Sequence, residues 1–158
     1  MGRIIPNQNS WIAFSATRPA SLAAPTVVEI AAATNITKFI ISLNATAQGN
    51  AVPTPALDSL FETSVPGTSQ ATFTGDFYRD DIADDAWTLL ARGTAGYFFI
   101  SRFGGTGIKF APAATQKLEV WPVRITTRAA GPMSSNTAQT FSITCSVPEL
   151  PAEEAVAT

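Results

Sequence analysis

The densest group of side chains that could do chemistry is a cluster of four aspartates. They are Asp80, Asp81, Asp84 and Asp85. Clustered carboxylates bind a hard cation such as calcium, or they pair with a basic surface. The loop of alternating acidic residues and a glycine that calcium usually requires is absent from this segment. The cluster therefore predicts ion pairing, within the chain or with another subunit, and no metal site.

Two other patterns fall short of a catalytic site. Asp76 and Asp81 could be imagined as the carboxylate pair of a glycoside hydrolase, but nothing else in the chain supports that reading. Residues 104–109 (Gly-Gly-Thr-Gly-Ile-Lys) resemble part of a phosphate-binding loop. Phe110 follows the lysine where that motif requires Ser or Thr, and Pro112 opposes a helix start. We interpret this segment as a glycine turn between strands.

The composition removes most remaining catalytic chemistry. The chain has no histidine, so the commonest general base and metal ligand and every Ser-His or Cys-His pair are missing. Cys145 is the only cysteine, and we expect it to be a small buried hydrophobe on a strand. Trp11, Trp87 and Trp121 lie in apolar patterns that favour packing over sugar binding. We expect neither an enzyme nor a cofactor.

The elements that carry these residues are mainly β-strands. Period-two alternation or β-branched, apolar runs predict strands over residues 11–16, 37–43, 71–78, 96–103, 118–127 and 140–147. Pro122 interrupts its strand, which predicts an edge position or a bulge there. We expect a β-sandwich or barrel.

One flanking α-helix is predicted over residues 80–91. Its apolar residues recur at helical spacing, its acidic start suits the helix dipole, and Arg92-Gly93 marks a stop. The spacing of Thr26 and Glu29 is that of a capping box, so a short helix could also begin there. The β-branched neighbours of those two residues suit a strand equally well.

Three segments fall outside this regular pattern, although a length of 158 residues suits a single domain over residues 1–158. Residues 44–70 are rich in Ala, Pro, Thr and Gly and predict a long loop between strands. Loops beyond ~12–15 residues are uncommon without a function, so this one is a binding arm or is broken by a short element around residues 57–61. Residues 1–10 and 148–158 read as terminal arms.

Charge is scarce and unevenly distributed. Charged residues make up 14% of the chain, against ~25% in typical soluble domains. That shortage favours a surface covered by other protein, although a surface rich in Thr, Ser and Ala would also account for it. Residues 58–91 hold seven acidic residues and one arginine, a net of −6. Residues 92–128 hold six basic residues and one glutamate, a net of +5.

Such segregation suits head-to-tail association into rings or filaments. The alternative is that the two segments neutralise each other within one fold. The basic residues are singly spaced and the pI is about 5.0, which does not favour tight nucleic-acid binding. No stretch approaches the ~18 apolar residues of a membrane span, so we expect no membrane partner and synthesis in a cytosol-like compartment.

The order of motifs resembles a known family from about Ala71 onward. Its parts are Phe77-Tyr-Arg-Asp-Asp81, Ala86-Trp-Thr-Leu-Leu90, Arg92-Gly-Thr-Ala-Gly-Tyr-Phe98, Lys117-Leu-Glu-Val-Trp-Pro-Val-Arg124, Gly131-Pro-Met and an acidic tail after Pro148. This succession is similar to the major tail tube proteins of long, non-contractile-tailed bacteriophages, especially those of actinobacteria. Residues 1–70 are similar to the family only in general layout: a short N-terminal strand, a Pro-Thr-x-x-Glu segment and then a variable stretch.

The resemblance implies hexameric rings that stack around a hollow lumen in the virion tail. The partners would be further copies of the chain, the tape measure, terminator and distal tail proteins, and double-stranded DNA in passage. Residues 44–70 would stack the rings and the two terminal arms would bridge them. The lumen of such tubes is usually acidic, which keeps DNA from sticking.

Together, charge layout and resemblance nominate ten residues for contacts between subunits. They are Asp80, Asp81, Asp84, Asp85, Arg102, Arg124, Arg128, Leu57, Leu60 and Phe61. Two other readings stay open. One is a tail terminator or capsid decoration protein, and the other is a sugar-binding β-sandwich.

Overall fold

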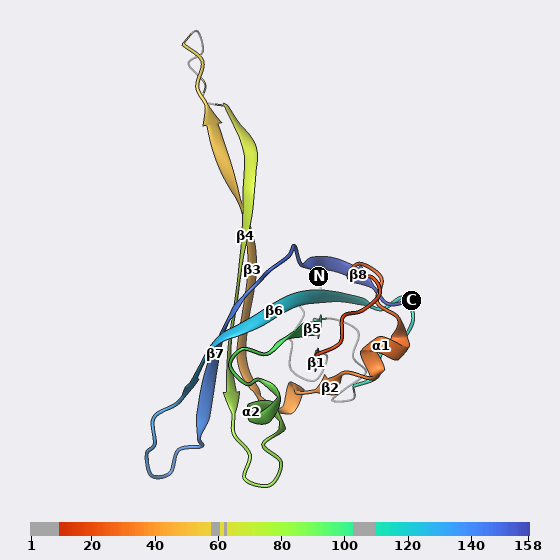
Figure 1. The fold of residues 1–158 in the computed structure, drawn as a ribbon, viewed down its shortest axis with the longest axis vertical. Helices are drawn as coiled ribbons and strands as arrows, with labels where there is room; N and C mark the ends of the chain where they lie inside the picture. Colours follow the sequence, from red (N-terminus) through yellow and green to blue (C-terminus); the bar gives the residue numbers. More distant parts are fainter. Residues whose placement is uncertain (1–9, 58–60, 62, 103–109) are drawn as a thin grey trace, which may run out of the picture.

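The computed structural model describes residues 10–57, 61, 63–102 and 110–158. Its elements are β1 (Trp11–Ser15), α1 (Val27–Ala31), β2 (Thr34–Asn35), the 3-10 helix η1 (Thr37–Phe39), β3 (Ile40–Thr54), β4 (Thr63–Tyr78), α2 (Asp85–Leu89), β5 (Ala95–Ser101), β6 (Lys117–Ala130), β7 (Thr140–Ser146) and β8 (Ala152–Val156) (Figure 1). The prediction of a mainly β fold is confirmed.

All eight strands belong to one antiparallel sheet that folds into two layers. The strand order is β2-β1-β5-β6-β7-β4-β3, and β8 also pairs with β6. The first half of β6 pairs with β5 and β8, and its second half pairs with β7. Pro122 falls between the end of β8 pairing at Val120 and the start of β7 pairing at Arg124. A residue without an N–H is tolerated there because that side of β6 has no partner at this point.

The main core lies between the two layers and is rich in aromatic rings. Phe73 of β4 stacks on Phe98 of β5 with ring centroids 4.6 Å apart, and Phe77 stacks on Phe141 at 5.2 Å. All four are buried. Complete burial of such a side chain stabilises the fold by roughly 1.5–3 kcal/mol, so these rings fix how the layers face each other.

A second cluster packs beneath α1 and β8. Ile30 of α1 is buried there with Phe99 and Leu118. The capping box is confirmed, because the Thr26 hydroxyl accepts the N–H of Glu29 and the Glu29 carboxylate accepts the N–H of Thr26. These bonds satisfy N–H groups at the helix start that have no partner within the helix.

The C-terminal segment is extended, as expected, but it lies along its own subunit. The N–H of Val156 donates to the carbonyl of Ala23, and that of Thr158 donates to Pro25. Ala155 and Ala157 are buried in the second cluster. A role for residues 148–158 between rings stays a prediction. Of the N-terminal arm, residues 1–9 lie outside the described residues.

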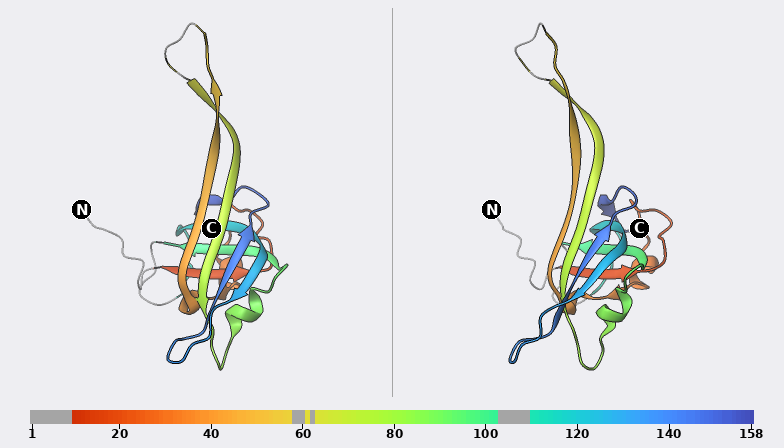
Figure 2. Two further views of the ribbon diagram at one scale, coloured as in Figure 1. Left: turned by 90° about the vertical axis from the view of Figure 1, so that its left-hand side faces the viewer. Right: turned by 60° about the vertical axis from the view of Figure 1, so that its left-hand side comes forward.

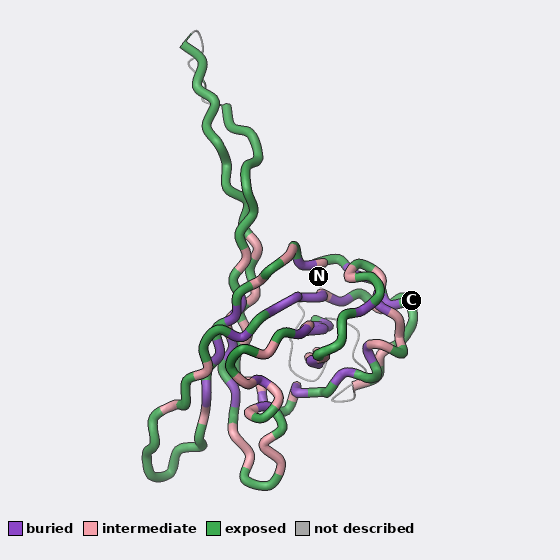
Figure 3. The backbone as a smooth tube through the Cα atoms, in the orientation of Figure 1, coloured by how far each residue is buried: buried purple, intermediate pink, exposed green. Residues whose placement is uncertain are grey.

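Residues 44–70 are not the irregular loop that the sequence predicted. Strands β3 and β4 continue into this segment and pair from Ile40 with Phe77 to Thr54 with Thr63. The hairpin stands clear of the body (Figures 1 and 2), and its outer half is exposed on all sides (Figure 3). The prediction failed because both faces of this half meet solvent, so the residues show no alternation of apolar and polar types.

Helix α2 falls inside the predicted range 80–91 but is shorter. The preceding residues form a turn in which the Asp80 carboxylate accepts the N–H groups of Ile82 and Ala83. Those two bonds lower the pKa of Asp80. Aspartate competes for backbone N–H groups in this way, so the helix begins later. Ala86 within the helix and Leu90 at its C-cap are buried against the main core.

Candidate assembly surfaces

Two open strand edges bound a four-stranded half of the sheet, β6-β7-β4-β3. In the described part of the chain, β3 pairs with β4 alone. The end of β6, residues 126–130, pairs with β7 on one side, and its other side has no strand partner among the described residues. An open edge presents unpaired N–H and C=O groups to any chain that can add a strand. This half of the sheet can therefore be extended in both directions.

The hairpin is the second surface suited to association. Leu57 and Phe61 are exposed near its tip, as are Val52 and Val65 on its strands. No charged residue occurs in β3, and β4 has only Asp76 near its far end. Exposed apolar side chains on strands with so few charged residues are typical of a contact surface. Leu60, the other tip residue nominated from sequence, lies outside the described residues.

The four nominated aspartates divide by environment. Asp84 accepts two hydrogen bonds from Arg79, from Nε at 2.9 Å and Nη2 at 2.5 Å. Asp80 caps the turn before α2. Asp81 and Asp85 are exposed. Two of the four are therefore held within the subunit, and two face solvent.

The nominated arginines also differ. The Arg128 guanidinium stacks over the Trp87 ring, 3.8 Å from its centroid, and donates to the Trp87 carbonyl at 2.7 Å. Arg79 lies over the same ring at 4.2 Å. Arg124 is exposed on β6 opposite Ser146. The ion pairs described are Arg18–Glu149, Arg79–Asp84 and Arg102–Glu119, and none of these three joins the acidic segment to the basic one.

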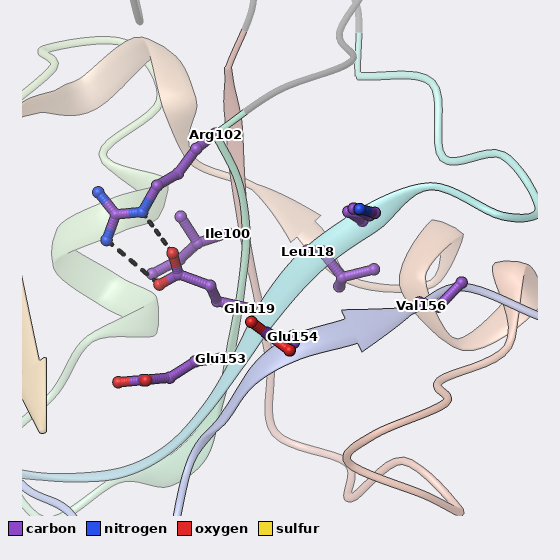
Figure 4. Close-up of a pocket in the computed structure, with 8 residues that line it drawn as sticks. Ile100, Arg102, Leu118, Glu119, Glu153, Glu154 and Val156 are labelled. Carbon is purple, nitrogen blue, oxygen red and sulfur yellow. Dashed lines mark hydrogen bonds and ion pairs between the residues drawn. The ribbon is translucent and has the colours of Figure 1, made fainter.

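Arg102 lies in a shallow pocket of about 450 Å³ between β5, β6 and β8 (Figure 4). Its guanidinium pairs with the Glu119 carboxylate, and that hydrogen bond raises the pKa of Arg102. Glu119 also accepts the indole N–H of Trp121 at 3.0 Å. Glu153 and Glu154 of β8 line the opposite side. Because Glu119 is held by two donors of its own subunit, this arrangement is a structural ion pair at an acidic rim.

No metal site is assembled by the residues that the structure describes. They contain no group of three or more acidic or cysteine residues placed to hold a metal ion. Burial raises the pKa of the Cys145 thiol to about 12. The glycine turn at 104–109 lies outside the described residues. Among the helices described, none is long and apolar enough to cross a membrane.

The nine nominated residues that the structure describes are spread over three regions: the hairpin tip, the surroundings of α2, and strand β6 with the pocket beside it. Sequence reasoning missed the open edges and the stacking of two arginines on Trp87. The sequence did contain a signal for the open edges, which is the scarcity of charge: β3, β4 and β7 together contain one charged residue. The stacking had no local signal, because Arg128 lies 41 positions from Trp87.

A sheet with two open edges and a projecting hairpin defines a subunit of an ordered assembly. The family model of the phage tail tube protein matches residues 1–158. The chain therefore belongs to the phage tail tube protein family and is a structural subunit of the virion tail.

Two solved structures share this fold at low sequence identity. A chain of the virion of a native gene transfer agent particle is 11% identical, with a TM-score of 0.56 over 95% of this chain and 96% of that one. A chain of the tail of an empty gene transfer agent particle, with C6 symmetry, is 10% identical, with a TM-score of 0.52 over 91% and 92%. No curated protein sequence matches the chain.

Proposed function

We propose that six copies of this chain close into a ring and that the rings stack head to tail into a hollow tube for the passage of double-stranded DNA. The observation that carries this proposal is the long hairpin, whose paired strands β3 and β4 contain one charged residue, beside a sheet open at both edges. The chain acts as a building block and not as an enzyme. It is made in the host cytoplasm, and the ends of the tube meet the tape measure, terminator and distal tail proteins.

Ring closure follows from the direction of the edge strands. Strands β3, β4, β7 and β6 alternate in direction, so β3 of one copy lies antiparallel to β6 of the next when the sheets join edge to edge. Six copies of four strands make a 24-stranded barrel. The C6 symmetry of the similar gene transfer agent tail supports this number.

We assign two kinds of contact to the stacking of rings: the hairpin and the exposed charged groups. Strand β3 has 15 residues, which at ~3.3 Å per residue span about 50 Å. Its outer half gains no burial in the isolated subunit, so the exposed apolar residues at the tip are available to a neighbouring ring. The exposed carboxylates of Asp81 and Asp85 add candidate ionic contacts.

A shortened hairpin tests the proposal. Gly49 pairs with Ser69, so replacing residues 50–68 by Asn-Gly keeps the ladder below that pair and closes it with a tight turn. A cut at residues 45–69 would also remove Ala45 and Ala47, which pack against the main core. We expect the shortened chain to keep its circular dichroism spectrum and to form no tubes in electron micrographs.

The matched control is Ser64→Ala, which changes an exposed polar residue of the same hairpin outside its apolar group and should still give tubes. Full-length tubes from the shortened chain would contradict the role of the hairpin. Single rings that never stack, formed by the unaltered chain, would instead favour a tail terminator.

A further inference from the structure

One face of the four-stranded half-sheet is left uncovered by the body of the subunit. The left panel of Figure 2 looks onto it. We call it the bare face and define it by twelve outward-facing residues on β3, β4, β6 and β7. They are Ser42, Asn44, Thr46, Thr72, Thr74, Asp76, Arg124, Thr127, Ala129, Ser142, Thr144 and Ser146.

These residues stand in register as three rows across the strands. The first row is Ser42-Asp76-Ser142-Ala129, the second is Asn44-Thr74-Thr144-Thr127, and the third is Thr46-Thr72-Ser146-Arg124. Eight of the twelve side chains carry a hydroxyl group. The residues that alternate with the twelve along the same strands, such as Phe73 and Ile143, point to the other face and are buried in the main core. The two faces of this half-sheet therefore differ completely in chemistry.

The bare face is close to neutral. Its charges are one carboxylate, Asp76, and one guanidinium, Arg124, two rows apart. Several hydroxyls are bound to neighbours: Ser42 donates to Asp76 at 2.8 Å, and Thr46 and Thr72 share a hydrogen bond of 2.8 Å. Cross-strand pairs of this kind stabilise the sheet, and they reduce the number of hydroxyl donors that a phosphate could engage.

Ring closure decides where this face points. The remaining strands and both helices lie on the other side of the half-sheet (Figures 1 and 2). In a closed ring of joined half-sheets, six bodies fit on the outside, where the circumference is larger, and would collide on the inside. A barrel of 24 strands at a spacing of ~4.8 Å is roughly 37 Å across between opposite backbones before strand tilt widens it.

We propose that the bare face is the wall of the lumen, and that DNA in passage meets rows of hydroxyl groups with no net charge instead of an acidic surface. This inference rests on the proposed ring. Tight binding of DNA requires cations that neutralise its phosphates. A wall of hydroxyls, four of the eight hydrogen-bonded to neighbouring groups, with one carboxylate to offset each guanidinium, supplies neither strong attraction nor strong repulsion.

Cysteine labelling of assembled tubes tests the placement. Cys145 is buried, so the unaltered chain supplies an unreactive background. Thr144→Cys places a thiol on the bare face, and Ser21→Cys places one on the exposed body as the matched control. In intact tubes we expect Thr144→Cys to react with a small maleimide and to lose reaction with a bulky polymer-linked maleimide. Ser21→Cys should react with both.

Each outcome decides the placement. Reaction of Thr144→Cys with the bulky reagent in intact tubes would put the bare face outside, and no reaction with either reagent would bury it between subunits. If Thr144→Cys fails to assemble, Ser142→Cys is read in its place. If the unaltered chain forms no tubes, the proposed ring is wrong and this inference falls with it. Tubes with an accessible bare face would overturn the inference alone.

A charge substitution tests the neutrality of the wall. Tubes of the unaltered chain, assembled with a linear DNA duplex, should leave the duplex open to nuclease. Thr144→Lys adds six cations per ring to the proposed lumen and should retain and protect the duplex at low salt, with the protection lost as salt rises. Ser21→Lys adds the same charge to the body and should give no protection. Equal nuclease digestion in all three would overturn the inference.

Discussion

Single residues show which of the nominated charges are used within the subunit. Trp87 receives Arg79 and Arg128 on its ring and meets the edge of Phe141 at 5.1 Å between centroids. Arg79 in turn holds Asp84. This chain of contacts ties α2 to the end of β6, and cation–π contacts at such sites contribute ~0.5–1 kcal/mol each. It leaves Asp81, Asp85 and Arg124 as the charges turned toward solvent.

Gly96 of β5 lies where β1 and β5 approach each other closely. A Cβ there would lie 2.3 Å from the Phe14 ring and 2.7 Å from the Ser15 carbonyl oxygen, whereas at Gly49 it would meet nothing within 4 Å. We expect Gly96→Ala to lower the free energy of unfolding by about 1–3 kcal/mol, because Phe14 has no room to move. Gly49→Ala should change it little. Urea denaturation of both variants checks this, and equal stabilities would refute the close approach.

Cys145 should make stability depend on alkaline pH. Burial raises its pKa from 9.0 to about 12 in the folded chain. Between those values the unfolded thiol loses its proton and the folded one keeps it, so the free energy of unfolding falls as pH rises. Below pH 9 the effect is absent. Urea midpoints of the unaltered chain and of Cys145→Ala should therefore fall by different amounts across this range, with the smaller fall in the variant.

Among the elements, β8 has a role within the subunit that the sequence pattern did not indicate. It lies in the predicted C-terminal arm, and its residues close the second core cluster and bridge α1, β6 and the segment before α1. The hairpin shows the opposite arrangement, since it is regular along its length and buries almost nothing in its outer half. Regular structure and burial are therefore separate properties of these elements, and assembly is the step that can join them.

Deleting residues 152–158 should destabilise the subunit itself. Five backbone hydrogen bonds between this segment and residues 23–27 or 115–116 would be lost. At about 1 kcal/mol each, the free energy of unfolding should fall by roughly 3–5 kcal/mol. Thermal unfolding followed by circular dichroism measures this. An unchanged melting temperature together with lost tube formation would show instead that the segment serves only as an arm.

The whole molecule combines strands that have few charges with a charged region. The strands β3, β4 and β7 together carry one charged residue, Asp76, whereas acidic and basic residues gather around α2. Such a division suits an assembly in which one part of each copy lines the tube and another part meets the next copy. Electrostatic complementarity between different surfaces gives such contacts their direction.

A charge reversal tests this at the scale of the assembly. Asp81→Lys combined with Asp85→Lys changes two exposed carboxylates near α2 and should leave the subunit folded. We expect slower tube growth, with a weaker dependence on salt than in the unaltered chain, because screening then has less attraction to remove. Light scattering during assembly measures both. The matched control, Glu154→Lys, lies at the pocket rim and should have a smaller effect.

Much of the fold followed from local pattern, and so did the absence of recognisable catalytic motifs. Alternation predicted strands such as β7, because one face of it is buried and the other is polar. The apolar run of β1 also predicted a strand, which packs on both faces, against the main core and the second cluster. The Thr26–Glu29 spacing allowed α1 because a capping box needs only four consecutive residues. The lack of histidine excluded His-based chemistry without any structure. The order of motifs pointed to the tail tube family.

Tertiary structure alone decided which side chains each surface presents. Nothing local distinguishes the hairpin from a loop, because its outer half meets solvent on both faces. Nothing local shows that Arg128 stacks on Trp87, that β8 closes the core, or that three hydroxyl rows align, since each depends on the register of strands distant in sequence. The composition determined that this chain has little charge, and the pairing of its strands determined where that charge is missing.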